Sequence, residues 1–190
     1  MLDYILELKP GTSDVSVYGK ALVLLGLFVW SWWFVIDPIG SGYPIRSFMH
    51  LVNLPFHEAG HVLFRPFGSL MTSLGGSLLQ VLMPFACTCV LLLRTRDPLG
   101  SAVALWWTGQ SLIDLAPYID DARSLSLTLL GGNTGATAPY GFHDWHYILT
   151  ETHLLERDHL IAGLSAGLGT LLMLAAFVWS LAVILRHRGG

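Results

Sequence analysis

The sequence predicts an all-α membrane protein in which four spans accompany a re-entrant or kinked helix that carries a histidine motif. Two observations predict this class: the composition and the length of the apolar runs. Of the 190 residues, 53% are hydrophobic and only 12% are charged, whereas a soluble domain usually carries about 25% charged residues. Apolar runs of about 20 residues are long enough to cross a bilayer as α-helices.

Four spans and one motif helix account for the apolar sequence. We expect the spans over about residues 18–36, 69–93, 99–117 and 159–185, and the motif helix over about residues 45–64. The motif helix contains Asn53, Pro55, Glu58 and two histidines, so it either re-enters the membrane or crosses it as a kinked fifth span. The spans leave no room for a second core, and we therefore expect residues 1–190 to form a single polytopic domain.

A polar region over residues 118–158 follows the third span. Two spans separate this region from the motif helix, so the two lie on the same side of the membrane whether the motif helix re-enters or crosses. If it re-enters, more of the Lys and Arg residues lie on the side of the two termini, which favours cytoplasmic termini.

Charge and targeting features limit the location and the partners. The formal net charge is −3, without the basic stripe that a nucleic-acid backbone requires, so nucleic acid is not an expected partner. The first apolar run has no small-residue cleavage site after it, which favours a retained span over a signal peptide. We expect an integral membrane protein of a bacterial cytoplasmic membrane, in contact with the lipid bilayer.

The segment Phe56-His57-Glu58-Ala59-Gly60-His61 contains the pattern His-Glu-x-x-His. On a helix, His57 and His61 lie on one face, where both imidazoles can bind one zinc ion. Zinc activates water and polarises a scissile carbonyl, and a neighbouring carboxylate takes the proton. Ionisable residues in an apolar segment are costly and mark function. The pattern predicts His57 and His61 as zinc ligands and Glu58 as the catalytic base.

Further features follow this motif. Leu74-Gly75-Gly76-Ser77 with Pro84 forms a glycine-rich apolar segment, and Asp114-Leu-Ala-Pro117 leads into Ile119-Asp120-Asp121. Together with the histidine motif, these residues resemble the site-2 protease family of intramembrane zinc metalloproteases, over roughly residues 50–123. The resemblance implies a third zinc ligand from an aspartate in a Leu-Asp-Gly motif. In the family, an Asn-x-x-Pro motif precedes this Leu-Asp-Gly. Here Asp114 stands in place of the asparagine, and the glycine is missing.

Two aspartates compete for the role of third ligand. Alignment with the family's Leu-Asp favours Asp120, whereas helical periodicity favours Asp121, which falls on the same face as Gln110 and Asp114. We choose Asp121, with Asp120 second. A helix break at Pro117 would invalidate the geometric argument. Asp114 is expected to face the bundle interior, where it can orient a ligand histidine.

A second histidine cluster, Phe142-His143-Asp144-Trp145-His146, lies in the polar region. Its two histidines are three residues apart and can bind zinc, so His143 is a further candidate for the third ligand. The simpler interpretation is an amphipathic helix at the membrane interface.

The features together predict a membrane-embedded zinc metalloprotease that hydrolyses peptide bonds of a membrane protein or peptide. The alternative is a non-proteolytic zinc-binding membrane scaffold derived from such a protease, which the missing Asp-Gly would fit. An intact Glu58 favours the enzyme, because a structural zinc site needs no base between its ligands. A transporter is less favoured, because the chain lacks paired, interrupted halves.

Overall fold

The computed structural model describes residues 5–189, and in this part of the chain the fold is all-α, as predicted. Seven α-helices are present in the described part: α2 (Asp14–Val35), α3 (Tyr43–Arg46), α4 (Phe48–Phe64), α5 (Ser69–Leu93), α6 (Pro98–Asp120), α7 (Asp144–Glu151) and α8 (Asp158–Gly189). Two short 3-10 helices, η1 (Arg65–Phe67) and η2 (Leu155–Arg157), join α4 to α5 and lead into α8.

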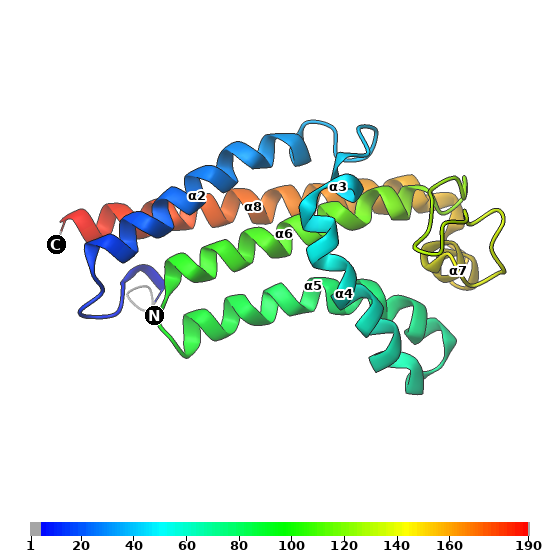
Figure 1. Ribbon diagram of the computed structural model, residues 1–190, viewed down its shortest axis with the longest axis horizontal. Helices are drawn as coiled ribbons and strands as arrows, with labels where there is room; N and C mark the ends of the chain where they lie inside the picture. The colour runs from blue at the N-terminus through cyan, green and yellow to red at the C-terminus, as the bar shows by residue number, and fades with distance from the viewer. Residues whose placement is uncertain (1–4, 190) are drawn as a thin grey trace.

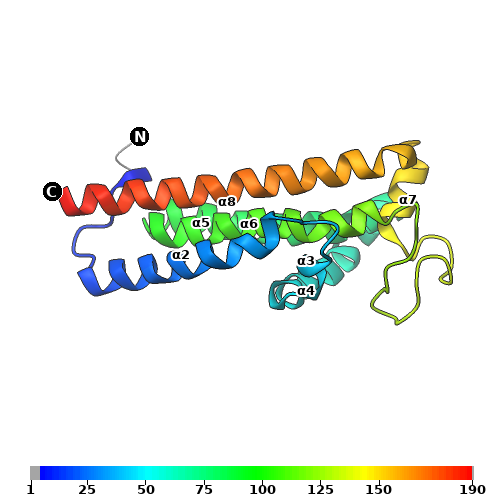
Figure 2. The ribbon, with the colours of Figure 1, turned by 90° about the horizontal axis from the view of Figure 1, so that it is seen from above.

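The four long helices α2, α5, α6 and α8 lie lengthwise beside one another (Figures 1 and 2). The start of α2 and the end of α8 lie at one end of this bundle, and α7 with the loop before it lies at the other end. The shorter helix α4 runs obliquely across α5 in the half of the bundle nearer α7. The histidine motif and the polar region therefore share one end of the molecule.

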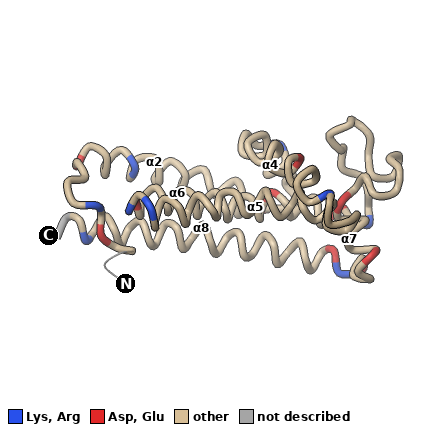
Figure 3. The backbone as a smooth tube through the Cα atoms, turned by 90° about the horizontal axis from the view of Figure 1, so that it is seen from below, with Lys and Arg blue, Asp and Glu red and all other residues tan. Residues whose placement is uncertain are grey.

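Three helical segments in the described part are long and apolar enough to cross a membrane: Asp14–Val35, Ser69–Leu93 and Leu155–His187. They match three of the predicted spans and indicate a membrane protein. Most charged residues lie toward the two ends of the bundle, which leaves the long middle of the helices almost free of charged residues (Figure 3). Such a distribution suits a bilayer, where charge in the hydrocarbon core is costly.

Helix α6 contains the remaining predicted span, residues 99–117, and is more polar than the other long helices. Its buried residues include Thr108, Gln110, Ser111 and Asp114. These side chains can be polar because they contact other helices and not lipid. Pro117 lies inside the last turn of α6 and does not end it, so the helix extends three residues beyond the predicted boundary.

Glycines set the closest approaches between helices. A Cβ at Gly109 of α6 would lie 2.5 Å from the carbonyl oxygen of Gly169 in α8, so these two backbones are in direct contact. Gly60 of α4 and Gly75 of α5 meet in the same way, because a Cβ on either would overlap the backbone of the other. The second contact brings the histidine motif against α5.

We expect Gly169→Ala to lower the free energy of unfolding by about 1–3 kcal/mol, because the new methyl group forces α6 and α8 apart. Thermal unfolding in detergent micelles, followed by tryptophan fluorescence, measures the change.

Gly163→Ala is the matched control on the same helix, because no described atom lies within 4 Å of a Cβ there. Alanine is a better helix former than glycine by about 1 kcal/mol, so this variant should unfold at or above the wild-type temperature. Equal destabilisation by both variants would contradict the assigned contact.

Candidate metal centre

His57 and His61 lie on the face of α4 that packs against α5. His57 is buried and His61 is partly buried, and their ring centroids are 4.9 Å apart. Gly76 of α5 faces them: a Cβ at this position would lie 2.7 Å from the Nε2 atom of each histidine. A side chain at position 76 would therefore occupy the space in front of both imidazoles, which explains the need for glycine.

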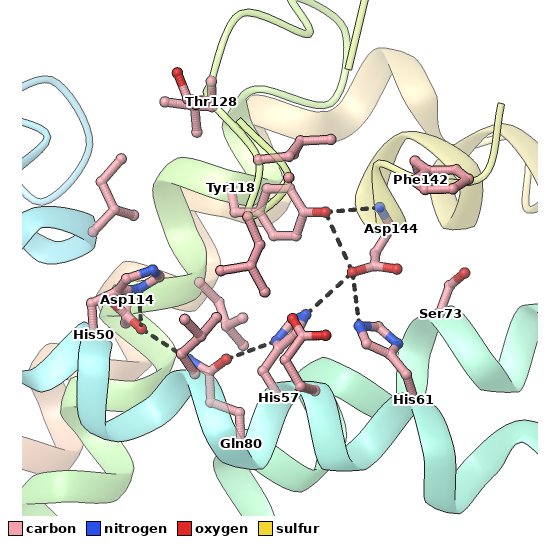
Figure 4. A pocket seen from close by; sticks show the side chains of 18 of the residues that line it. His50, His57, His61, Ser73, Gln80, Asp114, Tyr118, Thr128, Phe142 and Asp144 are labelled. Atoms are coloured by element: carbon pink, nitrogen blue, oxygen red, sulfur yellow. Dashed lines mark hydrogen bonds and ion pairs between the residues drawn. The ribbon is translucent and has the colours of Figure 1, made fainter. Parts of the chain in front are cut away.

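The third member of the group is Asp144, the first residue of α7. Its Oδ2 atom lies 3.2 Å from His57 Nε2 and 3.3 Å from His61 Nε2 (Figure 4). One ligand atom from each of the three residues lies within 4.8 Å of the others. Zinc bonds of about 2.0–2.2 Å at tetrahedral angles place ligand atoms roughly 3.4 Å apart. The donor set and its spacing therefore fit zinc.

The opposite nitrogen of each imidazole faces a hydrogen-bond acceptor. His57 Nδ1 lies 2.9 Å from Gln80 Oε1, and His61 Nδ1 lies 2.8 Å from the backbone oxygen of Thr72. Because both partners can only accept, each Nδ1 carries the hydrogen and each Nε2 is the nitrogen available to a metal. Both histidines are thus held in the tautomer that a zinc ligand needs.

Tyr118 and Trp145 hold Asp144 in position. The Asp144 backbone N–H donates to the Tyr118 hydroxyl at 2.9 Å, and this hydroxyl donates to Asp144 Oδ2 at 3.3 Å. Trp145 Nε1 donates to Ser77 Oγ at 3.2 Å, which fastens α7 to α5. Burial alone would raise the pKa of the Asp144 carboxyl, but hydrogen bonds from His57 and His61, made when each Nε2 also carries a hydrogen, outweigh burial and lower it. The carboxylate is therefore ionised, as a metal ligand must be.

The structure does not place Asp121, the first choice for the third ligand, with the histidines. Its carboxylate accepts hydrogen bonds from the side chain of Ser124, from the backbone of Ser126 and Leu127, and from His143 Nε2. Helix α6 ends at Asp120, so the helical periodicity that aligned Asp121 with Asp114 does not extend to it. Asp121 instead organises the loop after α6.

Asp120, the second choice, also lies apart from the histidine pair. Its carboxylate interacts with Nδ1 of His159, near the start of α8. Both aspartates therefore contact neighbouring segments, and the structure brings Asp144, not Asp120 or Asp121, to the histidine pair.

His143, the remaining candidate, caps α7. Its Nδ1 accepts from the backbone N–H of His146 at 3.1 Å, and its Nε2 contacts Asp121 at 3.2 Å. Both ring nitrogens are thus used outside the metal group. The segment from Phe142 to His146 does supply the third member, but through the aspartate between its histidines. The predicted location of this segment on the same side of the membrane as the histidine motif was the signal that could have identified Asp144.

Sequence reasoning also missed Gln80, Tyr118 and the full role of Asp114. Gln80 is 3% exposed, and a single amide in an otherwise apolar helix was the signal that could have found it. Asp114 does face the bundle interior, as predicted. It does not contact a ligand histidine itself but accepts from Gln80 Nε2 at 3.1 Å, and Gln80 in turn contacts His57.

Glu58 lies beside the group and is exposed. Its carboxylate has no hydrogen-bond or ion-pair partner within residues 5–189, and it lines a cavity of about 760 Å³. The three members of the metal group line the same cavity, together with apolar residues such as Leu54, Leu127 and Phe142. A carboxylate without a partner is therefore available to act on a molecule in this cavity.

The fold and the site define an all-α membrane protein with a His-His-Asp group that could hold a metal ion at the end of its helical bundle. No protein-family model, curated protein or solved structure matches this chain.

Zinc binding should depend on Asp144 and not on Asp121 or Asp120. We expect Asp144→Asn to lower zinc affinity by more than about 100-fold, because replacing a residue that only orients a ligand already costs 10–100-fold. Asp121→Asn and Asp120→Asn should keep about one zinc per chain, measured by elemental analysis of detergent-purified protein. Loss of zinc in Asp121→Asn and its retention in Asp144→Asn would instead support Asp121 as the third ligand.

Asp121 should stabilise the fold in a pH-dependent way. Burial raises its pKa, but hydrogen bonds from His143, Ser124, Ser126 and Leu127 prevail and hold the pKa below the ordinary value. Its stabilisation is therefore complete above the unfolded-state pKa of about 3.9 and is lost as the pH falls toward the folded-state value.

In metal-free protein at pH 7, Asp121→Asn should cost about 1–3 kcal/mol of unfolding free energy. The difference from wild type should shrink as the pH falls below about 4. A difference that is the same at pH 7 and pH 3, measured by thermal or denaturant unfolding, would contradict this role.

Proposed function

We propose that this protein is a membrane-embedded zinc metalloprotease that hydrolyses peptide bonds of a membrane-associated substrate. One observation carries the proposal: two imidazole nitrogens and a carboxylate converge at zinc-ligand spacing, and the unpartnered Glu58 lines the same cavity. Three protein ligands with an adjacent carboxylate are the arrangement of a catalytic zinc site, whereas structural sites are closed by four protein ligands.

The residues divide the chemistry between them. His57, His61 and Asp144 would hold zinc, which supplies Lewis acidity that activates water and polarises the scissile carbonyl. Glu58 would accept the proton of the attacking water and return it to the leaving amine. Tyr118 would keep Asp144 in place through the hydrogen bond to its carboxylate.

In the bilayer, we place α2, α5, α6 and α8 as four spans and α4 as a re-entrant helix. The lengthwise course of the four helices and the position of α4 in one half of the bundle support this arrangement. An even number of crossings puts the start of α2 and the end of α8 on one side, the cytoplasmic side of a bacterial inner membrane. The resemblance to site-2 proteases then covers the motif helix and α5, but the third ligand comes from a different segment.

The substrate is a membrane protein or peptide with a locally extended segment. Peptide bonds inside a helix are shielded by the helix's own side chains and hydrogen bonds, so a spanning substrate must unwind before it reaches Glu58. A cavity of about 760 Å³ is within the usual size range of ligand sites and has room for a few extended residues. The apolar part of its lining, which includes Leu54, Leu127 and Phe142, suits the side chains of a membrane segment.

Glu58→Gln tests the reaction. The amide keeps the shape of the side chain but cannot accept the proton, so we expect normal zinc content and a loss of turnover of about 100-fold to 10,000-fold. The assay reconstitutes the zinc-loaded protein into liposomes with a set of single-span membrane peptides and detects new peptide ends by mass spectrometry.

Glu7→Gln is the matched control, because it makes the same chemical change at the far end of the bundle, where Glu7 pairs with Arg186. It should leave turnover unchanged. A wild-type protein that holds one zinc but cleaves none of the peptides would support the non-proteolytic scaffold instead.

A further inference from the structure

A chain of buried polar side chains leads away from the metal group into the bundle. His57 Nδ1 lies 2.9 Å from Gln80 Oε1, and Gln80 Nε2 donates to Asp114 Oδ2 at 3.1 Å (Figure 4). Gln80 and Asp114 are each only 3% exposed, so each depends mainly on protein groups for its hydrogen bonds. The chain links a candidate ligand on α4 to an aspartate on α6 through a glutamine on α5.

The direction of each hydrogen bond in this series of side chains follows from its last member, the Asp114 carboxylate. A carboxylate and a backbone carbonyl can only accept, so Gln80 must turn its NH₂ group toward Asp114 Oδ2 and the backbone oxygen of Ser111, which lies 3.4 Å away. The oxygen of Gln80 then faces His57, whose Nδ1 must donate. In the neutral imidazole, the metal-facing Nε2 is then left without a hydrogen.

The two histidines reach the same tautomer by different routes. His61 donates to the backbone oxygen of Thr72, which can never become a donor. His57 depends on the amide of Gln80, whose two ends are alike in shape but opposite in hydrogen-bonding character. A rotation of that amide would present a donor to His57 and favour the tautomer that cannot bind metal through Nε2.

Asp114 is itself held in place by further side chains. His50 Nδ1 lies 3.1 Å from each of its carboxylate oxygens, and Asn53 Nδ2 donates to Oδ2 at 3.0 Å. Asn53 is fixed in turn, because its oxygen accepts from Trp107 Nε1 at 2.8 Å and from Ser111 Oγ. A buried carboxylate needs hydrogen-bond partners, and here His50 and Asn53 supply them from the first two turns of the motif helix.

We propose that Asp114 is a positioning residue for the metal site: it fixes the orientation of the Gln80 amide and thereby the tautomer of His57. This inference rests on the proposed zinc site but concerns residues that do not touch the metal. The site's affinity for zinc is then set partly from α6, at a residue joined to the ligand only through Gln80.

We call the series His57–Gln80–Asp114 the relay. The zinc affinities of the wild type, Asp114→Asn, Gln80→Leu and the double variant of the full chain test it. We expect Asp114→Asn to weaken zinc binding about tenfold, because an asparagine can either donate or accept and lets the Gln80 amide rotate. Gln80→Leu should weaken it about 10–100-fold, and adding Asp114→Asn to Gln80→Leu should weaken it no further. Competition with a chromophoric chelator in detergent gives each affinity.

Rescue separates positioning from general structural damage. A carboxylate at position 80 accepts from His57 in either orientation, so Asp114→Asn combined with Gln80→Glu should regain wild-type affinity within about twofold. The visible spectrum of the Co²⁺-substituted protein should return with it. Asp97→Asn is the matched control, because it makes the same change at the other end of α6, where Asp97 pairs with Lys20, and it should bind zinc normally.

Each result decides between the two proposals. If the wild type binds zinc and Asp114→Asn binds it equally well, the relay is wrong and the zinc site stands. The relay is also wrong if the double variant with Gln80→Leu loses affinity additively, or if Gln80→Glu brings no rescue. A wild type that binds no zinc would overturn the proposed function and the relay with it.

Discussion

The contact of the Asp144 carboxylate with His57 and His61 is the interaction on which the rest of the site depends. It joins α7 to α4, since His61 and Asp144 are 83 positions apart in the sequence. It also closes the end of the bundle over the cavity. The groups involved are buried or partly buried, and buried polar groups without partners are costly. The carboxylate and the imidazoles therefore hold one another, and a metal ion can take the place of the hydrogens between them.

Helix α6 makes this arrangement possible because it is shielded from lipid. It packs against α5 and α8, closely enough at Gly109 and Gly169 for backbone contact. A helix enclosed in this way can carry Gln110 and Asp114 at its centre and can use them to hold neighbouring helices. In the proposed enzyme, the same helix supplies Tyr118 to Asp144 and Asp114 to Gln80, so both sides of the metal group are oriented from one rigid element.

Much of the fold was predictable because the patterns that specify it are local. The span over 69–93 is α5 to the residue, since Arg65-Pro66 and Gly68 interrupt the helix before it and Arg94 follows its apolar run. His57, His61 and Glu58 were singled out in the same way, because two candidate ligands four residues apart on one helix need no tertiary information. Periodicity failed at Asp121, where the helix had already ended.

The sequence by itself determined the all-α class, the long apolar helices and the histidine pair, because each depends on residues within one helix. Only the tertiary structure decided that Asp144 joins the histidine pair, that Asp121 contacts His143 instead, and that Gln80 connects Asp114 to His57. These contacts join residues 22 to 87 positions apart. Nothing in the local spacing specifies them, since they arise where α4 packs on α5 at glycine and where the loop after α6 returns α7 to the bundle.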